Sequence, residues 1–415
     1  MKVAVIGSGG REHALIWKLG QNLDRNDIFA IPGNGGTSNN IDISIDNFSE
    51  IRGFCEKENI ELVIVGPEAP LVDGIVDYFA DSPIRVFGPD RIAAQLEGSK
   101  IWAKKFMEKH GVATAGFKAY ENKQDPDDEI ERLGGDLVIK YDGLAGGKGV
   151  FVTSSIQEAT QAVKTIREKY GENATFIIEE KLHGQEISII GFTDGKNIKL
   201  LLPSQDHKPA LDGDKGPNTG GMGAYCPVPM CNEVLMEAIQ TSVVQPTLDG
   251  IRAEGLNYKG VIYFGLMITN EGPKLLEYNV RLGDPEAEVI LPALKSDLLP
   301  VITACFDDSL AKIELEFNPH YYVDVVLTSQ GYPGSYDTGF EISGIEDVSD
   351  DILVFQSGTT QKEGRILTAG GRVLNVVARG HDLQSAINLA YRDLKTIHFH
   401  NMNYRTDIGH KGLVS

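Results

Sequence analysis

Short apolar runs alternate with helix-length segments over the first hundred residues. The runs KVAVIG, DIFAIPG, IELVIVG and IRVFGP each have the length and composition of a buried strand. Segments long enough to form helices separate them, beginning with one from about Glu12 to Gly20. Strands connected through helices form a parallel sheet with helices on both faces. The sequence therefore predicts a parallel α/β domain at the N-terminus.

The pattern changes after residue 100. SKIWAKKFMEKH predicts a helix capped by Ser99, with Trp102 and Phe106 on one face. Two apolar runs, a helix near 156–170 and a further pair of strands then predict a small α+β unit. A larger α+β segment follows, and the last part is rich in β-branched residues and turns, with one helix at 382–396. We expect four parts, over residues 1–100, 101–190, 191–325 and 326–415.

Length and charge narrow the class of protein. A chain of 415 residues is expected to form two to four domains. Its net charge of −20 argues against nucleic-acid and anionic-membrane partners. We find no signal peptide and no apolar run of 18 residues, and the four cysteines show no zinc spacing, so they are expected to be reduced thiols. A cytoplasmic monomer is expected.

A glycine-rich loop lies between two predicted strands in LVIKYDGLAGGKGVFV, which carries Lys140 and Lys148. The stretch is not a P-loop, because counting back from Gly147 places Asp142 where glycine is needed, and Gly149 follows the lysine in place of Ser or Thr. A flexible loop of this kind can still close over phosphates with its backbone N–H groups. The alternative is a mobile hairpin with surface lysines.

The N-terminal turn GSGGREH invites a comparison with dinucleotide-binding loops. Glu12 stands where the third glycine of G-x-G-x-x-G belongs, and the second strand ends at Pro32 without the expected acid. Nicotinamide binding is therefore not supported. A helix N-terminus behind a glycine turn still favours anions, so we interpret it as a phosphate site. A tight strand–helix turn without a ligand is the alternative.

The stretch LLEYNVRLGDPE carries the most specific polar pattern. Glu277 and Asn279 are two residues apart on a predicted strand and so share a face, and Arg281 continues the same spacing. Two oxygen ligands suit Mg²⁺, which keeps waters and phosphate oxygens in its coordination sphere. Burying polar side chains in an otherwise apolar strand costs free energy unless a ligand pairs with them. An edge strand with a solvated face is the alternative.

Three further stretches carry polar residues, but each stretch alone is weak evidence for a binding site. In FIIEEKLHGQEISI, backbone groups at the edge of a strand can bind a purine ring, and Glu186 can accept hydrogen bonds from ribose hydroxyls. The alternative is an ordinary amphipathic strand with solvated carboxylates. GPNTGGMGAY and SQDHKPA are polar loops that can also be surface turns. We find no Ser-His-Asp or Cys-His arrangement.

Together these stretches resemble the ATP-grasp superfamily and, within it, the phosphoribosylamine–glycine ligase family, also called the glycinamide ribonucleotide synthetase family. The resemblance runs along the chain through VIGSGGREHAL, VGPEAPLVDG, AAQLEGSK, VIKYDGLAGGKGV, SQDHK, GPNTGGMGAY and NVRLGDPE. Ser8 stands where the family often has Asn, and Tyr278 where it has Phe, but neither change removes a proposed ligand.

The resemblance implies a fold of an N-terminal parallel α/β domain, a two-lobed ATP-grasp core and a C-terminal β-rich domain. It also implies an ATP-dependent ligase that joins glycine to 5-phosphoribosylamine through glycyl phosphate in de novo purine biosynthesis. ATP and Mg²⁺ or Mn²⁺ would be required, and the partners would be small molecules.

The resemblance also assigns expected roles to residues. The lysines expected to contact ATP phosphates are Lys104, Lys140 and Lys148. The residues expected around adenine and ribose are Glu179, Glu180, Leu182 and Glu186. The residues expected to bind the metal are Glu277 and Asn279, and those expected to be catalytic are Arg281 and Lys148. The residues expected to face the substrates are Gly9, Gly10, Arg11, Glu68, Asp206, Lys208, Asn218, Thr219, Gly220 and Gly221.

Three other functions remain as alternatives at this point. A related ATP-grasp ligase or carboxylase would differ only in its acceptor residues. A nucleotide-dependent oxidoreductase would rest on the N-terminal domain alone, where the third glycine and the ribose acid are missing. A non-catalytic nucleotide-binding protein is disfavoured by the Glu277, Asn279 and Arg281 set.

Overall fold

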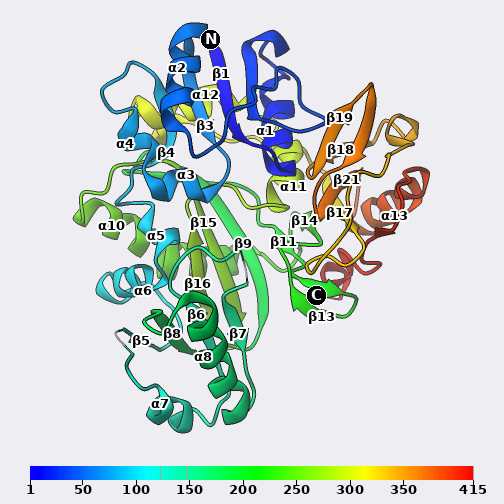
Figure 1. The fold of residues 1–415 in the computed structure, drawn as a ribbon. Coiled ribbons are helices and arrows are strands. Elements are labelled where there is room, and N and C mark those ends of the chain that lie inside the picture. The colour runs from blue at the N-terminus through cyan, green and yellow to red at the C-terminus, as the bar shows by residue number, and fades with distance from the viewer. Residues whose placement is uncertain (122, 147, 415) are drawn as a thin grey trace.

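The computed structural model of the chain describes residues 1–121, 123–146 and 148–414. Three sheets and two small hairpins organise these residues (Figure 1). The N-terminal strands lie at the top of the view, the C-terminal sheet at its right and a small sheet at its bottom. The fold is mixed α/β with a parallel N-terminal sheet, as the sequence predicted.

The first four strands are parallel and lie in the order β2-β1-β3-β4. Their bounds are β1 Lys2–Gly7, β2 Ile28–Pro32, β3 Ile60–Val65 and β4 Arg85–Pro89. The helices that connect them are α1 Gly10–Leu19, α2 Phe48–Glu58, α3 Glu68–Asp73 and α4 Ile75–Tyr78. The carboxyl ends of β1 and β3 therefore open toward one edge, where ligands of such sheets bind.

This parallel sheet continues into an antiparallel one. Tyr258 pairs with Pro89, and Lys259 with Gly88, so the strand that begins at Tyr258 joins β4 directly. The strands added in this way are β9 Gln185–Thr193, β10 Ile198–Leu200, β15 Tyr258–Thr269 and β16 Gly272–Asn279. One eight-stranded sheet thus carries both the N-terminal segment and the strand that holds Glu277 and Asn279.

A separate four-stranded sheet, at the bottom of Figure 1, carries the glycine-rich loop. Its strands are β5 Phe117–Tyr120, β6 Leu137–Tyr141, β7 Val150–Val152 and β8 Phe176–Glu180. The helices of this part are α7 Asp127–Arg132 and α8 Ile156–Tyr170. Leu137, Ile139, Val163 and Phe176 are buried together in a core of their own. This small sheet with its two helices is hereafter the small lobe.

The C-terminal sheet takes two strands from the middle of the chain. Its strands are β11 Gln205–Asp206, β14 Gly223–Cys226, β17 Tyr321–Ser329, β18 Ile352–Gln356, β21 Arg372–Gly380 and β22 Met402–Asn403. Helix α13, Leu383–Asp393, packs against β17 and β21. The two hairpins are formed by β12 Pro209–Leu211 with β13 Lys215–Asn218, and by β19 Thr359–Lys362 with β20 Arg365–Thr368.

The remaining α-helices connect these sheets. They are α5 Gln95–Gly98, α6 Lys100–Lys109, α9 Glu233–Ile239, α10 Gln245–Ala253, α11 Glu286–Ala293 and α12 Leu298–Phe306. Helix α6 begins as predicted, since the Ser99 side chain accepts a hydrogen bond from the Trp102 N–H. The rings of Trp102 and Phe106 stack 5.6 Å apart. Strands β9 and β17 run across the expected part boundaries at residues 190 and 325.

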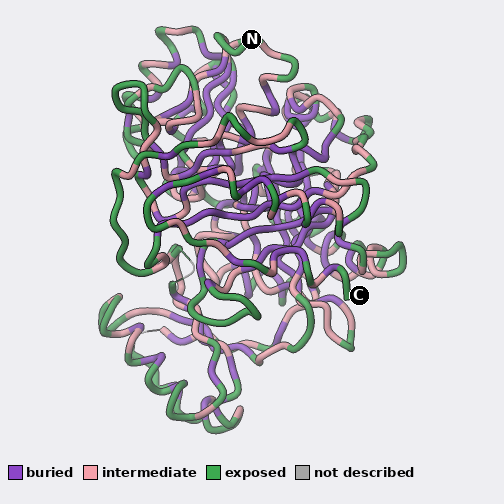
Figure 2. The backbone as a smooth tube through the Cα atoms, turned by 90° about the vertical axis from the view of Figure 1, so that its right-hand side faces the viewer, coloured by how far each residue is buried: buried purple, intermediate pink, exposed green. Residues whose placement is uncertain are grey.

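Alternate residues of the central strands face two different cores. Ala4, Ile6 and Val63 belong to one buried cluster, and Val3 and Val5 to another. This follows from the two-residue period of a strand covered on both faces. Figure 2 shows buried backbone through the middle of the molecule and more exposed backbone in the small lobe. Within the described residues, no helix combines the length and apolarity that a membrane crossing requires.

Candidate active site

A cavity of about 690 Å³ lies where the eight-stranded sheet, the small lobe and the C-terminal sheet meet. Most of the residues singled out from the sequence line it. They are Arg11, Glu68, Lys104, Lys140, Glu179, Glu180, Leu182, Glu186, Asp206, Lys208, Asn218, Thr219, Gly220, Glu277, Asn279 and Arg281. Residues more than 250 positions apart in the chain thus share one cavity.

Four of the expected residues lie outside the described lining of this cavity. Lys148 is exposed to solvent on the glycine-rich loop, and Gly147 of the same loop falls outside the described residues. Gly10 is packed so closely that a Cβ there would lie 2.0 Å from Asn375 Nδ2. Gly221 has φ +120°, and a Cβ there would lie 2.3 Å from a Pro285 carbon. Gly9 is the N-cap residue of α1, and its N–H donates to Glu12.

Two lysines share one carboxylate where helix α6 meets the small lobe. Lys104 Nζ lies 3.3 Å from Glu179 Oε1, and Lys140 Nζ lies 3.0 Å from Glu179 Oε2. All three side chains are buried, and burial lowers the pKa of Lys104 to about 8 although Glu179 opposes this shift. Glu180, next along β8, is exposed. Two ammonium groups against one carboxylate make this wall suitable for an anion.

Lys208 lies between carboxylates in the same cavity. Its Nζ is 3.0 Å from Glu186 Oε2 and 3.9 Å from Glu277 Oε1. Burial would lower the pKa of Lys208, but Glu186, Asp206 and Glu277 raise it well above the usual value. Burial raises the pKa of Asp206 to about 7, although Lys208 opposes this. Asp206 can therefore exchange a proton near neutral pH.

Glu277 and Asn279 lie two residues apart on β16, as the sequence predicted, and both line the cavity. Burial would raise the pKa of Glu277, but Lys208, Lys140 and Lys100 lower it below the usual value. Glu277 is therefore an anionic oxygen donor at neutral pH. Within the described residues, no three His, Cys, Asp or Glu side chains form a metal site by themselves. The pair fits a Mg²⁺ ion that completes its coordination with phosphate oxygens and water.

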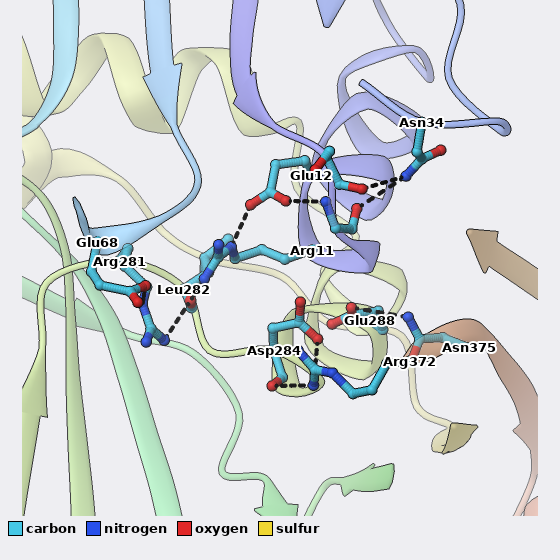
Figure 3. Close-up of polar contacts among 12 residues, drawn as sticks. Arg11, Glu12, Asn34, Glu68, Arg281, Leu282, Asp284, Glu288, Arg372 and Asn375 are labelled. Carbon is cyan, nitrogen blue, oxygen red and sulfur yellow. Dashed lines mark hydrogen bonds and ion pairs between the residues drawn. The ribbon is translucent and has the colours of Figure 1, made fainter. Parts of the chain in front are cut away.

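Arg281 lies beyond the end of β16 and is held by two carboxylates. Its Nη2 is 2.9 Å from Glu97 and its Nε is 3.2 Å from Glu68, and it also donates to the Leu282 carbonyl. Burial raises the pKa of Glu97 to about 7, although Arg281 opposes this. Figure 3 shows Arg281 and Glu68 together, with Arg11 donating to the same Leu282 carbonyl. The guanidinium is thus oriented before any substrate arrives.

Glu12 explains why the N-terminal turn departs from the dinucleotide pattern. Its carboxylate accepts hydrogen bonds from the Gly9 N–H and from Arg11 Nε, both at 2.6 Å. Figure 3 shows this pair at the start of α1. A Cβ on Gly66 would lie 2.0 Å from Glu12 Oε1, so the glycine after β3 makes room for this side chain. Glu12 therefore orients Arg11 toward the cavity.

Several cavity residues were missed by the sequence analysis, among them Glu97, Lys100, Asp284, Glu286 and Arg372. The first four lie inside AAQLEGSK and NVRLGDPE, so their place in motifs already identified was an available signal. Arg372 comes from β21, and its Nη1 lies 3.0 Å from Asp284 Oδ1 and donates to the Gly220 carbonyl. No spacing in the sequence connects it with the cavity.

Comparisons with known proteins agree with this layout along the whole chain. Models of three domains described as phosphoribosylglycinamide synthetase match it: the N domain over 1–97, the ATP-grasp (A) domain over 98–287 and the C domain over 322–411. The phosphoribosylamine–glycine ligase of Clostridium acetobutylicum is 45% identical over 415 residues, covering 99% of both chains. The ligase of the same name from Synechocystis sp. is 44% identical over 421 residues, covering 100% of both.

A solved structure shows the same architecture. The crystal structure of phosphoribosylamine–glycine ligase from Thermotoga maritima superposes with a TM-score of 0.85 at 34% identity, covering 98% of this chain and 100% of that one. Sequence and structure therefore agree over all three domains. The chain belongs to the phosphoribosylglycinamide synthetase family, whose central domain is an ATP-grasp domain.

Proposed function

We propose that the chain joins glycine to 5-phosphoribosylamine with cleavage of ATP to ADP and phosphate, and so forms glycinamide ribonucleotide in de novo purine biosynthesis. Membership of the family makes it an ATP-dependent ligase. One observation gives the proposal its strongest support. Three pairs of polar residues line the same cavity: Lys104 with Lys140, Glu277 with Asn279, and Asp206 with Lys208.

The reaction needs an activated carboxyl group, because oxide is a poor leaving group. The glycine carboxylate attacks the γ-phosphorus of ATP, and ADP leaves as the P–O bond breaks. The amine of phosphoribosylamine then attacks the carbonyl of glycyl phosphate, phosphate leaves, and the amine loses a proton. Catalysis of phosphoryl transfer depends mainly on positioning and on neutralising charge.

Lys140 would contact the ATP phosphates from the small lobe, and Lys104 would do so from the neighbouring helix α6. Lys148 would join them when the glycine-rich loop closes and excludes water from the acyl phosphate. Backbone groups at the end of β8 would hold the adenine, close to Glu179, Glu180 and Leu182, and Glu186 would accept the ribose hydroxyls. All of these residues except Lys148 line the same cavity, which supports this assignment.

Glu277 and Asn279 would hold Mg²⁺ or Mn²⁺. When bound, the ion supplies positive charge that neutralises the phosphates and orients them. Arg281, already oriented by Glu97 and Glu68, would steady the phosphoryl group and the glycyl carboxylate. Its charge would stabilise the negative oxygens that develop during transfer.

The other substrate would lie toward the N-terminal sheet and the C-terminal sheet. The residues proposed to face it are Gly9, Gly10, Arg11, Glu68, Asp206, Lys208, Asn218, Thr219, Gly220 and Gly221. Asp206 is suited to receive the proton that the amine loses, because burial raises its pKa to about 7. Gly9, Gly10 and Gly221 would act through their backbone, since their packing leaves no room for a side chain.

We also propose that the four parts 1–100, 101–190, 191–325 and 326–415 correspond to an N-terminal substrate domain, the small and large lobes of the ATP-grasp core and a C-terminal domain. The proposed partners are small molecules, and a cytoplasmic monomer is the proposed state. Size-exclusion chromatography with light scattering tests the last point, and a dimer would refute it.

The decisive experiment measures phosphate release from ATP with phosphoribosylamine generated in situ. We expect release that requires both glycine and phosphoribosylamine, with glycinamide ribonucleotide as the product by mass spectrometry. Bicarbonate in place of glycine tests a carboxylase. Turnover with bicarbonate, or turnover that does not need phosphoribosylamine, would reject the proposed acceptor.

A further inference from the structure

The hairpin of β12 and β13 begins and ends inside the cavity. Lys208 immediately precedes it and Thr219 immediately follows it, and both line the cavity. The N–H of Thr219 donates to the Lys208 carbonyl at 2.8 Å, and its hydroxyl donates to the same oxygen at 2.7 Å. The hairpin therefore carries Asn218 and continues directly from Lys208, while the residue before Lys208 is held by the C-terminal sheet through the hydrogen bond from the His207 N–H to the Gly223 carbonyl.

The hairpin itself is poorly buried. All four residues of β13 are exposed, and a two-stranded ribbon is marginally stable by itself in water. Its position must be supported from outside. The support comes from residues 405–411, close to the C-terminus, which Figure 1 shows next to β13.

Arg405 is the centre of this support. Its side chain is 1% exposed, and its Nη1 donates to the Pro209 carbonyl and to Asp214 Oδ1, both at 3.0 Å. Its Nε and Nη2 donate to the two oxygens of Asp407, both at 2.7 Å. The planar fork of the guanidinium thus binds the first strand of the hairpin, its turn and the C-terminal segment at the same time.

Other contacts fasten the turn to the same segment. Asp407 Oδ2 accepts a hydrogen bond from the Gly213 N–H at 2.8 Å. Asp212 accepts one from the Thr406 N–H at 2.8 Å and another from the Thr406 hydroxyl. Lys411 Nζ lies 2.6 Å from Asp214. Charged, mutually bonded groups of this kind hold geometry more tightly than isolated surface pairs do.

We propose that the C-terminal segment 405–411 is a positioning element of the acceptor site, and that Arg405 holds the hairpin 209–218 so that Lys208 and Asn218 face phosphoribosylamine. Arg405 is a positioning residue, because it reaches the substrate side only through the hairpin. The proposal deepens the function proposed above and rests on it for the identity of the acceptor.

Three variants test the contact with graded severity. Arg405→Met removes every polar contact of the guanidinium while keeping its apolar stem. Arg405→Lys keeps the charge but cannot form the fork. Asp214→Asn removes one charge from the ion pairs with Arg405 and Lys411 at a residue with φ +55°, a backbone conformation that Asn adopts without added strain. Arg379→Met is a control for the loss of an arginine ion pair away from the hairpin, since Arg379 lies on β21, pairs with Asp351 and is half exposed.

The first measurement is hydrogen–deuterium exchange, which needs no substrate. We expect faster exchange over 209–219 in Arg405→Met and Asp214→Asn, with unchanged exchange in β1, β3 and the small lobe. Arg405→Lys should lie between Arg405→Met and the wild type, and Arg379→Met should match the wild type. Unchanged exchange over 209–219 in both Arg405→Met and Asp214→Asn would overturn the proposal.

The second measurement separates the Michaelis constants of the substrates. We expect the KM for phosphoribosylamine to rise at least fivefold in Arg405→Met and about twofold in Asp214→Asn. The KM for ATP should stay within twofold. A loosened hairpin with an unchanged KM for phosphoribosylamine would also overturn the proposal. A wild-type chain without glycine-dependent turnover would instead reject the proposed function, and the exchange result would still decide whether 405–411 holds the hairpin.

Discussion

The guanidinium of Arg281 and the carboxylate of Glu97 form an ion pair of 2.9 Å at the wall of the central cavity. The side chain of Glu97 is 7% exposed and that of Arg281 is 17% exposed. Glu97 also accepts a hydrogen bond from the Val280 N–H at 2.7 Å, so it fixes both the backbone and the side chain around Arg281. The cation is therefore presented to the cavity in one orientation.

Arg281→Lys tests this orientation. Lysine keeps the charge but cannot pair with Glu97 and Glu68 at once through a planar fork. We expect kcat to fall about 100-fold, a loss of about 3 kcal/mol of transition-state stabilisation, while the affinity for an ATP analogue stays within threefold. Steady-state kinetics and calorimetric titration measure the two. Arg252→Lys, on the exposed face of α10, is the control, and equal kcat in the two variants would contradict the role.

Lys148→Ala is expected to lower turnover more than tenfold without unfolding the protein. Lys148 is exposed on the loop between β6 and β7, so its contribution requires the loop to close over the phosphates. Lys164→Ala, which removes an exposed lysine of α8, should leave turnover unchanged. Thermal unfolding of both variants checks the fold. Wild-type turnover in Lys148→Ala would refute the role of this lysine.

Glu179→Gln should destabilise the protein while Glu180→Gln should not. Removing the charge of Glu179 leaves Lys104 and Lys140 buried against each other without their shared carboxylate. Breaking a buried ion pair in this way costs about 3 kcal/mol or more. Glu180, the exposed neighbour on β8, supplies a matched control. Urea unfolding measures the difference. Equal free energies of unfolding for the two variants would show that the ion pairs of Glu179 with Lys104 and Lys140 do not contribute to stability.

Glu277→Gln should weaken the use of a divalent ion more than the binding of the nucleotide itself. The change removes the negative charge of the proposed metal ligand and keeps its shape. We expect the Mg²⁺ concentration for half-maximal turnover to rise about tenfold, which is about 1.4 kcal/mol. Binding of an ATP analogue in EDTA should change less than twofold. The proposed ligand role would fail if the Mg²⁺ dependence of the variant and the wild type coincide.

His207 should make the folded state sensitive to acid. Burial lowers its pKa from 6.5 to about 3, and the nearby charges of Lys411 and Arg405 add to the shift. As the pH falls from about 6.5 toward 3, His207 is protonated in the unfolded chain but stays neutral in the folded chain. The free energy of unfolding therefore decreases over this pH range. Between pH 7 and pH 5 we expect this group to contribute a loss of about 2 kcal/mol.

The measurement compares urea unfolding of the wild type and His207→Gln at both pH values. The wild type should lose about 2 kcal/mol more than the variant over this range. His381→Gln is the control, because the His381 side chain is 81% exposed. Parallel pH dependence in the wild type and His207→Gln would show that the imidazole is protonated in the folded chain.

Local patterns predicted most elements of this fold. The four parallel strands of the N-terminal sheet follow from apolar runs with strand length, α6 follows from its Ser99 cap and apolar face, and α8 lies where a helix near 156–170 was expected. Local patterns did not predict that β15 pairs with β4, or that β11 and β14 belong to the C-terminal sheet. Such contacts join segments far apart in the chain, and the two-residue period shows which face is buried without showing the neighbour.

Prediction of the site divides in a similar way. Glu277 and Asn279 follow from strand periodicity, and Lys140 follows from its place at the edge of the glycine-rich loop. The pairing of Glu179 with both lysines does not follow, because it depends on how β6, β8 and α6 pack. Arg372 could not be predicted as a cavity residue for the same reason, since only the tertiary fold brings β21 to the cavity.

The hydrogen bonds between β4 and β15 also limit how the molecule can move. Because the N-terminal strands and the strand before Glu277 belong to one sheet, the walls that they form cannot hinge apart without breaking backbone pairing. The small lobe has its own sheet and its own core. We expect the nucleotide to enter and ADP to leave through a movement of the small lobe against this rigid base, and time-resolved distance measurements between labels on α8 and α2 would follow that movement.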